Sequence, residues 1–133
     1  TPHPVEMSRL IQRRKQDVER NRKGVAQEFA NRYACVLLLK GNKTVVASPG
    51  KKVYTNASGN AGMATAGSGD VLSGMIAAFT AQGLSGFDAA KYGAYIHGKA
   101  GDLAAKAKTR LSMTASDIID CIPKAIQSLQ LNI

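Results

Sequence analysis

Residues 62–76 read GMATAGSGDVLSGMI and join a glycine-dense turn to the start of an apolar pattern. Gly67, Ser68 and Gly69 carry little or no side chain, so their backbone N–H groups can approach a ligand closely. The apolar residues that follow recur at the spacing of one helix face; they are Val71, Leu72, Met75, Ile76 and Phe79. The stretch therefore predicts an anion hole at a helix N-terminus, where free N–H donors and the helix dipole favour a phosphate or a developing oxyanion.

Asp70 is the carboxylate inside this predicted anion site. A negative charge suits the first turn of a helix, so Asp70 is either a helix-stabilising acid or a general base. As a base it would take the proton of a substrate hydroxyl beside a bound phosphate. The segment is not a Walker A loop, because no Lys follows Gly69, and no GxGxxG lies nearby to indicate a dinucleotide fold.

The composition indicates an α/β protein of one domain or part of one. The chain has 133 residues, of which 44% are apolar and only 5% aromatic, so aliphatic side chains must form its core. Cys35 and Cys121 lie in apolar runs without metal-ligand spacing, which predicts reduced core residues in a cytoplasmic protein. No apolar stretch approaches the roughly 20 residues of a membrane span, so no membrane partner is expected. We find no signal peptide, and because the chain starts at Thr1 without Met we expect that its original N-terminus is missing.

Positive charge is concentrated in the first part of the chain. The net charge is +9, and residues 1–53 hold 12 Lys and Arg against 4 Asp and Glu. Most of the excess lies in residues 9–32, and the aromatic residues that could stack on bases are confined to the end of this segment, at Phe29 and the adjacent Tyr33. We therefore expect a solvated basic helix face and no nucleic-acid partner, with attraction of an anionic nucleotide substrate as the alternative.

The hydrophobic pattern predicts an α/β order with few strands. Residues 35–39 are uniformly apolar, which favours a strand buried on both faces, as in a parallel sheet. The two shorter strands are expected to pair antiparallel near a sheet edge. Because these are too few for a complete doubly wound sheet, we expect that a preceding part of the protein supplies neighbouring strands. The predicted helices cover 6–11, 14–33, 68–82, 87–108 and 114–129, and the predicted strands cover 35–39, 44–47 and 52–55.

The predicted helix at 87–108 is unusually rich in small residues. Its interior glycines include Gly93, Gly98 and Gly101, and each costs a helix about 1 kcal/mol relative to Ala. This cost implies close packing against a neighbouring helix. His97 on the same helix is expected to pack rather than to catalyse. In the last helix Thr114 or Ser116 is the expected N-cap, and Pro123 should kink the helix.

The stretch from Asn60 to Gly74 resembles the signature of the ribokinase-like superfamily. Within it, the stretch is most similar to the nucleotide-dependent NAD(P)H-hydrate dehydratases. The resemblance implies a ribokinase-like layered α/β/α fold, with residues 1–133 as the C-terminal part of a single dehydratase domain. Three further segments resemble family elements in the same order, namely Thr1-Pro2-His3-Pro4-x-Glu6-Met7, Lys40-Gly41-x-x-Thr44 and Ala115-Ser116-Asp117-Ile118-Ile119.

The activity implied by this resemblance is that of a lyase in nicotinamide nucleotide repair. ADP or ATP would phosphorylate the ring hydroxyl of hydrated NADH or NADPH, and loss of phosphate would regenerate NAD(P)H. Asp70 would take the hydroxyl proton, and the N–H groups of Gly67, Ser68 and Gly69 would hold the charge of the phosphoryl group. Mg²⁺ would accompany the nucleotide, although no carboxylate cluster in the sequence predicts a metal site of the chain itself.

The resemblance also implies binding residues. His3, Asp70 and Asn60 would contact the hydrate, although Asn60 could equally serve only to shape its turn. Val5 and Ala66 stand where the family usually has Gly, which bears on the path of the loop after His3 and on backbone approach at the glycine turn. The implied nucleotide-binding residues are Lys40, Gly41, Asn42, Lys43, Thr44 and Gly69.

Two other functions fit the same residues. One is a ribokinase-like kinase that phosphorylates a vitamin-precursor alcohol, because the glycine turn and Asp70 would serve that reaction equally well. The other is a non-catalytic nucleotide-binding module. A homo-oligomer is expected in each case, while the choice of ADP or ATP, of NADH or NADPH hydrate, and the presence of a fused epimerase domain stay open.

Overall fold

The computed structural model describes residues 1–129 and contains six α-helices around a small sheet. Every helix and strand predicted above has a counterpart, although several boundaries differ. The helices are α1 (Pro4–Leu10), α2 (Lys15–Arg20), α3 (Arg22–Tyr33), α4 (Ser68–Ala81), α5 (Gly86–Ala107) and α6 (Ala115–Gln127). The strands are β1 (Leu37–Leu39), β2 (Val45–Ala47) and β3 (Tyr54–Thr55), and a 3₁₀-helix, η1, spans Ala61–Met63.

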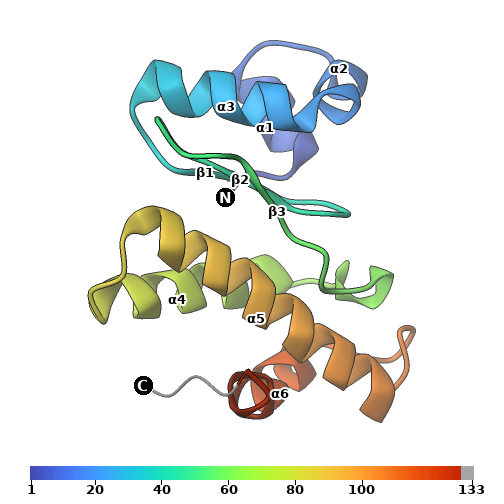
Figure 1. The fold of residues 1–133 in the computed structure, drawn as a ribbon. Coiled ribbons are helices and arrows are strands. Elements are labelled where there is room, and N and C mark those ends of the chain that lie inside the picture. The colour runs from blue at the N-terminus through green and yellow to red at the C-terminus, as the bar shows by residue number, and fades with distance from the viewer. Residues whose placement is uncertain (130–133) are drawn as a thin grey trace.

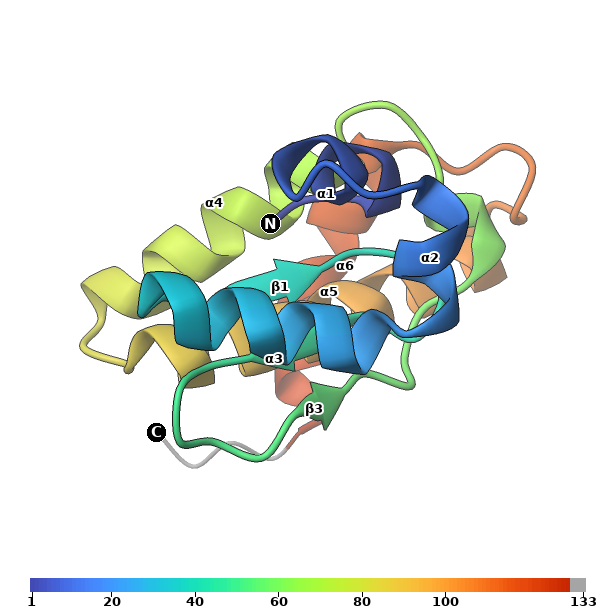
Figure 2. The same ribbon diagram turned by 90° about the horizontal axis from the view of Figure 1, so that it is seen from above.

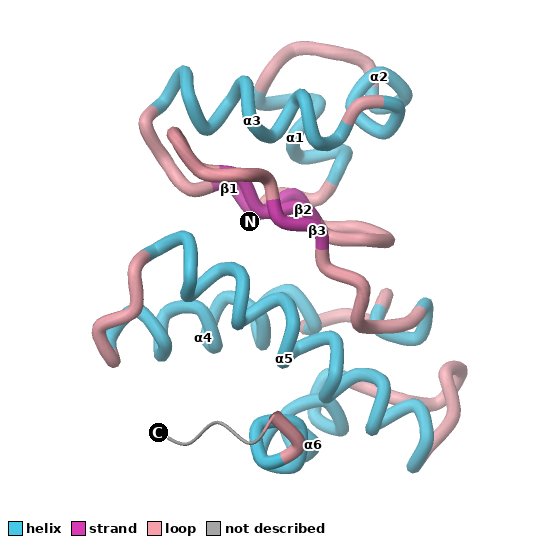
Figure 3. Tube along the Cα trace, viewed as in Figure 1, coloured by secondary structure: helices cyan, strands magenta, loops and turns pink. Residues whose placement is uncertain are grey.

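The sheet forms the middle layer of the molecule (Figures 1 and 3). Its strand order is β1-β2-β3 and both pairings are antiparallel, with Leu38 opposite Val46 and Val45 opposite Thr55. Helices α1, α2 and α3 cover one face, and Figure 2 shows α3 lying across the strands. Helices α4 and α5 cover the other face, and α6 packs beyond them. This is the layered α/β/α arrangement that the family resemblance implies.

Alternate residues of β1 face opposite layers, which explains why the strand is apolar throughout. Leu37 and Leu39 pack in a cluster with residues of α1, α2 and α3, whereas Leu38 packs with Leu72 of α4 and Ala90 of α5. Burial of β1 on both faces is therefore confirmed. The strand that pairs with it in residues 1–129 is antiparallel rather than parallel.

The single helix predicted over 14–33 is wrong, because the structure divides it at Asn21. This residue has φ −134° and ψ 53°, outside the helical range, and it separates α2 from α3. The Asn21 side chain accepts a hydrogen bond of 3.1 Å from the Gly24 N–H. Asn21 is thus the N-cap of α3, a role for which Asn is strongly preferred.

Proline and threonine set two other helix starts. Helix α1 begins at Pro4, earlier than predicted, because the first turn of a helix does not need the N–H that proline lacks. The departure from the family pattern at Val5 therefore lies within this helix. Helix α6 begins after Thr114, which forms a capping box with Asp117, and it continues through Pro123.

The glycines of α5 pack closely, but not all against a helix. A Cβ on Gly93 would lie 2.8 Å from Ile76 of α4, as predicted. Gly98 and Gly101 instead face the connection between β3 and α4, where an added Cβ would collide with Ser58 or Met63. The glycines of α5 therefore allow close packing both of α4 and of the segment that leads into the glycine turn.

Two further predictions concern the cysteines and the membrane. Cys35 and Cys121 are free, as expected, but both are partly exposed rather than buried in the core. Within residues 1–129, no helix combines the length and the apolar character that crossing a bilayer requires.

Candidate functional site

The glycine turn ends in a sharp entry to α4. Gly67 is the N-cap with φ +83° and ψ −13°, a left-handed conformation that suits a residue without Cβ. Its carbonyl accepts the N–H groups of Asp70 at 3.0 Å and Val71 at 3.1 Å. The Asp70 side chain is exposed in the first turn of α4, and no basic side chain of residues 1–129 lies within ion-pair distance of it. The carboxylate is therefore accessible to a ligand.

Only some of the backbone N–H groups around this turn have a hydrogen-bond acceptor within residues 1–129. The Ser68 N–H donates to the Thr65 carbonyl at 3.3 Å. In the part of the chain that the structure describes, the N–H groups of Ala66, Gly67 and Gly69 donate to no acceptor. Of the three predicted anion-hole residues, Gly67 and Gly69 thus keep available donors, while the Ser68 donor is engaged.

Lys40 connects the end of β1 to this turn. Its amine nitrogen lies 3.1 Å from the position that a Cβ on Gly69 would occupy. The same amine lies 3.9 Å from Oε2 of Glu6, and the Lys40 N–H donates to the Pro2 carbonyl at 2.8 Å. Lys40 therefore brings together the N-terminal segment, the end of β1 and the start of α4.

His3 lies next to this junction as the N-cap of α1. Its Nδ1 accepts the backbone N–H of Glu6 at 3.2 Å, and the backbone N–H of His3 donates to Glu6 Oε2 at 2.7 Å. This backbone hydrogen bond is the main reason why the pKa of Glu6 is lowered, with smaller contributions from the charges of His3 and Lys40. The Glu6 carboxylate therefore contacts two predicted site residues, His3 and Lys40, and the Lys40 amine in turn lies beside a third, Gly69.

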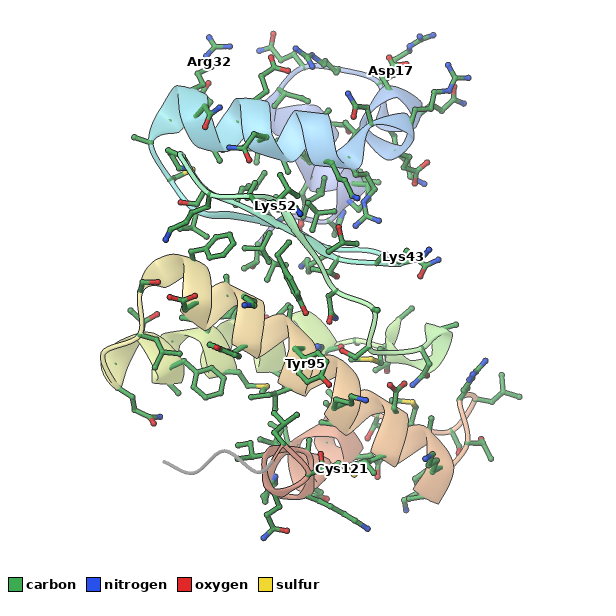
Figure 4. All side chains as sticks on the ribbon, viewed as in Figure 1. Asp17, Arg32, Lys43, Lys52, Tyr95 and Cys121 are labelled. Atoms are coloured by element: carbon green, nitrogen blue, oxygen red, sulfur yellow. The ribbon has the colours of Figure 1, made fainter. Side chains whose placement is uncertain are left out.

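The predicted nucleotide loop continues from Lys40 into the turn between β1 and β2. Gly41 has φ +136° and Lys43 has φ +56°, so the chain reverses through two left-handed residues. The Thr44 hydroxyl donates to the Gly41 carbonyl at 3.1 Å and closes the turn. Figure 4 shows Lys43 at the outer tip of this turn.

Asn60 lies farther along, as the N-cap of η1. Its amide donates to the carbonyl of Gly101 and to Oδ1 of Asp102, both at 3.0 Å, and its Oδ1 accepts the Gly62 N–H at 3.0 Å. These bonds favour the interpretation that Asn60 shapes the turn. It also borders an open groove of about 490 Å³ that is lined by Lys99, Lys106 and Arg110 among others.

His97 contacts the glycine turn from α5, a contact that the sequence analysis did not predict. The residue is 7% exposed, and its Nε2 lies 3.4 Å from the hydroxyl of the buried Ser68. Burial lowers the pKa of His97 from 6.5 to about 4, against a smaller opposing effect of a hydrogen bond with the Ser68 backbone. The imidazole is therefore neutral near pH 7 and packs beneath the turn, as the packing interpretation predicts.

Asn56 is a second residue that sequence reasoning missed. It is 4% exposed, and its amide donates to the carbonyls of Ala94 at 3.1 Å and Ser58 at 3.2 Å. Its Oδ1 accepts the Ser58 hydroxyl at 3.0 Å. These bonds fasten the connection after β3 to α5. No spacing in the sequence indicates this role, because an isolated Asn in a loop is common.

The described residues contain no metal site of their own. No group of three or more His, Cys, Asp and Glu side chains in residues 1–129 is arranged to hold an ion. The chemistry available at the site is therefore an accessible carboxylate, a lysine amine and free backbone N–H donors.

Several known proteins are similar to this chain in sequence or in fold. A model of the NAD(P)H-hydrate dehydratase family matches residues 1–124. The bifunctional NAD(P)H-hydrate repair enzyme Nnr of Moorella thermoacetica is 47% identical over 130 residues, which cover 98% of this chain and 24% of that protein. The ADP-dependent (S)-NAD(P)H-hydrate dehydratase of Neisseria meningitidis is 47% identical over 103 residues, covering 77% of this chain and 35% of that protein.

Solved structures show the same fold. The ADP/ATP-dependent NAD(P)H-hydrate dehydratase of Bacillus subtilis, co-crystallised with ATP and Mg²⁺, superposes with a TM-score of 0.92 at 29% identity. The match covers 97% of this chain and 47% of that structure. A ribokinase-like superfamily protein of Enterococcus faecalis gives a TM-score of 0.77 at 30% identity, over 96% of this chain and 43% of that structure. The chain thus spans less than half the length of these relatives, and it belongs to the NAD(P)H-hydrate dehydratase family.

Proposed function

We propose that residues 1–133 form the C-terminal part of one dehydratase domain that restores NADH or NADPH from its hydrate with ADP or ATP. The observation that carries this proposal is the Lys40 amine, 3.1 Å from the position of a Cβ on Gly69. This contact supports the proposal because it sets a cation beside Gly69, whose N–H has no acceptor in residues 1–129 and which precedes Asp70 in the chain. The names of similar proteins support the reaction class, since they are dehydratases or repair enzymes for hydrated NAD(P)H.

In the first step of the proposed reaction, Asp70 accepts the proton of the ring hydroxyl. The hydroxyl oxygen then bonds to the terminal phosphorus of ADP or ATP as the bond from that phosphorus to the rest of the nucleotide breaks. The N–H groups of Gly67 and Gly69 and the Lys40 amine stabilise the charge on the transferring group. In the second step the C–O bond to phosphate breaks, and the departing phosphate or a water molecule accepts a proton from the adjacent ring carbon, which restores the ring double bond.

Mg²⁺ would supply additional charge neutralisation on the nucleotide phosphates. Residues 1–129 hold no group of three or more His, Cys, Asp and Glu side chains arranged for an ion, so we propose no protein ligand for Mg²⁺ among them. Lys40, whose amine is partly exposed beside Gly69, would share the charge neutralisation from the protein side.

The proposal is tested by incubating the protein, as it occurs in the cell, with hydrated NADH and either ADP or ATP. We expect the NADH absorbance band to return only when nucleotide is present, together with one released phosphate for each NADH formed. Nucleotide binding without any return of NADH would overturn the proposed reaction.

The kinase alternative is decided by a parallel incubation with a thiamin-precursor alcohol. We expect no phosphoester to accumulate. Accumulation of the phosphoester without hydrate repair would instead favour a small-molecule kinase, and nucleotide binding without either product would favour a binding module.

A further inference from the structure

Arg22, the first residue of α3, reaches from the basic region into the turn between β1 and β2. Its guanidinium donates to the carbonyls of Leu39 at 2.9 Å and Lys40 at 3.1 Å, and also to the carbonyl of Asn42. The side chain is partly buried, and burial lowers its pKa, although the arginine stays charged near pH 7. Three backbone carbonyls of one turn are therefore held by a single cation.

These bonds also fix where the backbone N–H groups of the turn point. In a trans peptide the C=O of one residue and the N–H of the next point in opposite directions. The carbonyls of Leu39, Lys40 and Asn42 face Arg22, so the N–H groups of the residues that follow them face away from it. The first of these donors, on Lys40, binds the Pro2 carbonyl at 2.8 Å, as this geometry requires.

The other two donors face away from Arg22 without an acceptor. The N–H groups of Gly41 and Lys43 make no hydrogen bond in the part of the chain covered by the structure. A side chain at position 41 would also meet the guanidinium, because a Cβ there would lie 3.0 Å from its NH2 nitrogen, at φ +136°. The glycine and the arginine therefore depend on each other for this conformation.

The geometry points to Arg22 as a positioning residue that turns the N–H groups of Gly41 and Lys43 toward acceptor oxygens of the bound nucleotide. This inference rests on the proposed function, because it takes ADP or ATP as the ligand of the turn. Arg22 itself stays behind the backbone and does not touch the nucleotide. Its contribution is to hold three peptide planes in one orientation before the ligand arrives, so that less conformational freedom is lost on binding.

Arg22→Met, Arg22→Lys and the matched control Lys23→Met test this role in the protein as it occurs in the cell. Lys23 is an exposed residue on the same helix, so its replacement removes the same charge without touching the turn. We expect Arg22→Met to raise the Kd for ADP and ATP at least about 10-fold and to raise KM for the nucleotide more than it lowers kcat. Arg22→Lys should raise the Kd less than Arg22→Met, because a lysine keeps the charge but carries its donors on one nitrogen, whereas Arg22 bonds the Leu39 and Asn42 carbonyls through different guanidinium nitrogens. Lys23→Met should leave the Kd within about twofold.

Amide hydrogen exchange separates this role from a purely structural one. In the unsubstituted protein we expect ADP or ATP to slow exchange at Gly41 and Lys43, and in Arg22→Met this protection should be lost in the folded molecules. If Arg22→Met does not fold, the same measurements on Arg22→Lys decide. A reduced melting temperature with unchanged affinity and protection would overturn the inference, whereas failure of the unsubstituted protein to bind either nucleotide would overturn the proposed function instead.

Discussion

The turn at residues 40–44 and the turn at residues 65–69 meet at the Lys40 amine, but the fold holds them in different ways. In the first, a charged side chain from α3 binds the backbone carbonyls directly. In the second, glycine at the N-cap and a neutral His97 in contact with Ser68 hold the turn without any charge. Both leave backbone N–H groups without acceptors in the described residues.

This difference shows two physical routes to the same surface. A turn held by a cation depends on that charge staying bonded to each carbonyl, and at Gly41 the cation also leaves no room for a side chain. A turn built on close packing needs no charge, but it fails when a single methyl group is added. The first turn should therefore be sensitive to changes of charge, and the second to changes of volume and of the protonation of His97.

The largest expected effect is on catalysis by Asp70→Asn at the second turn. Loss of the general base should lower kcat by about 1000-fold, while the Kd for ADP or ATP changes little, because the backbone donors remain. Hydrate repair and nucleotide titration measure the two quantities. Asp120→Asn is the control, since Asp120 is an exposed acid on α6. Near-normal turnover by Asp70→Asn would exclude this residue as the base.

The next effect concerns the protonation of His97. Its pKa of about 4 in the folded protein lies below the ordinary 6.5, so between these values the unfolded chain binds more protons. The free energy of unfolding should therefore decrease as the pH falls through this window, by up to about 3 kcal/mol from this residue alone. Denaturant titrations of the unsubstituted protein and of His97→Gln at several pH values measure the difference. Parallel pH profiles for the two proteins would show that His97 is not held neutral.

Added volume at Gly98, which faces the connection that leads from β3 to the second turn, should have a slightly smaller effect. Gly98→Ala would bring its Cβ into collision with the Ser58 hydroxyl and place it 2.7 Å from the Ser58 carbonyl carbon. We expect a loss of about 2 kcal/mol in the free energy of unfolding. Gly74→Ala is the matched control in α4, because nothing lies within 4 Å of its added Cβ, and it should stabilise the helix by up to about 1 kcal/mol. Equal effects of the two substitutions would contradict the packing argument.

The smallest predicted effect is that of Thr114→Ala at the start of α6, which is a third way of ending a turn at a helix. Helix α6 starts with a side-chain cap from Thr114, whereas α4 starts on Gly67 without one. Thr114→Ala should lower the free energy of unfolding by about 1 kcal/mol, and it should leave nucleotide binding unchanged. Thermal unfolding and ADP titration measure both. A change in ADP affinity would show that α6 is coupled to the site, contrary to our expectation.

Much of the fold could be predicted because its signals are local. The apolar run that contains β1 and the apolar stripe on α4 are both short-range patterns, and the structure confirms them. The helix rich in small residues is also present, although of its three interior glycines only Gly93 packs against another α-helix. The break at Asn21 could not be predicted in this way, because the helical pattern of residues 14–33 continues across it. Only the backbone at Asn21 and its bond to Gly24 reveal that two helices are present.

The candidate site is less predictable because its contacts are made between distant segments. Motifs of the family singled out His3, Lys40 and Gly69 separately, but no rule of spacing places the Lys40 amine over Gly69. The roles of Arg22 and Asn56 lie further out of reach, since an arginine in a basic helix and an asparagine in a loop are ordinary in sequence. Their bonds to backbone carbonyls depend on how the layers pack.

The geometry of Lys40 has one more consequence, which concerns how movement would pass between the two ligands. Its N–H is bonded to Pro2, its carbonyl to Arg22, and its amine lies beside Gly69, so three segments share one residue. A shift of the N-terminal segment on binding of a hydrate would therefore change the affinity for the nucleotide. By linkage, the nucleotide would change the affinity for the hydrate by the same factor. Lys40→Met removes only the amine and keeps both main-chain hydrogen bonds of residue 40. It would therefore show whether the coupling between the two ligands depends on the charge or on the backbone.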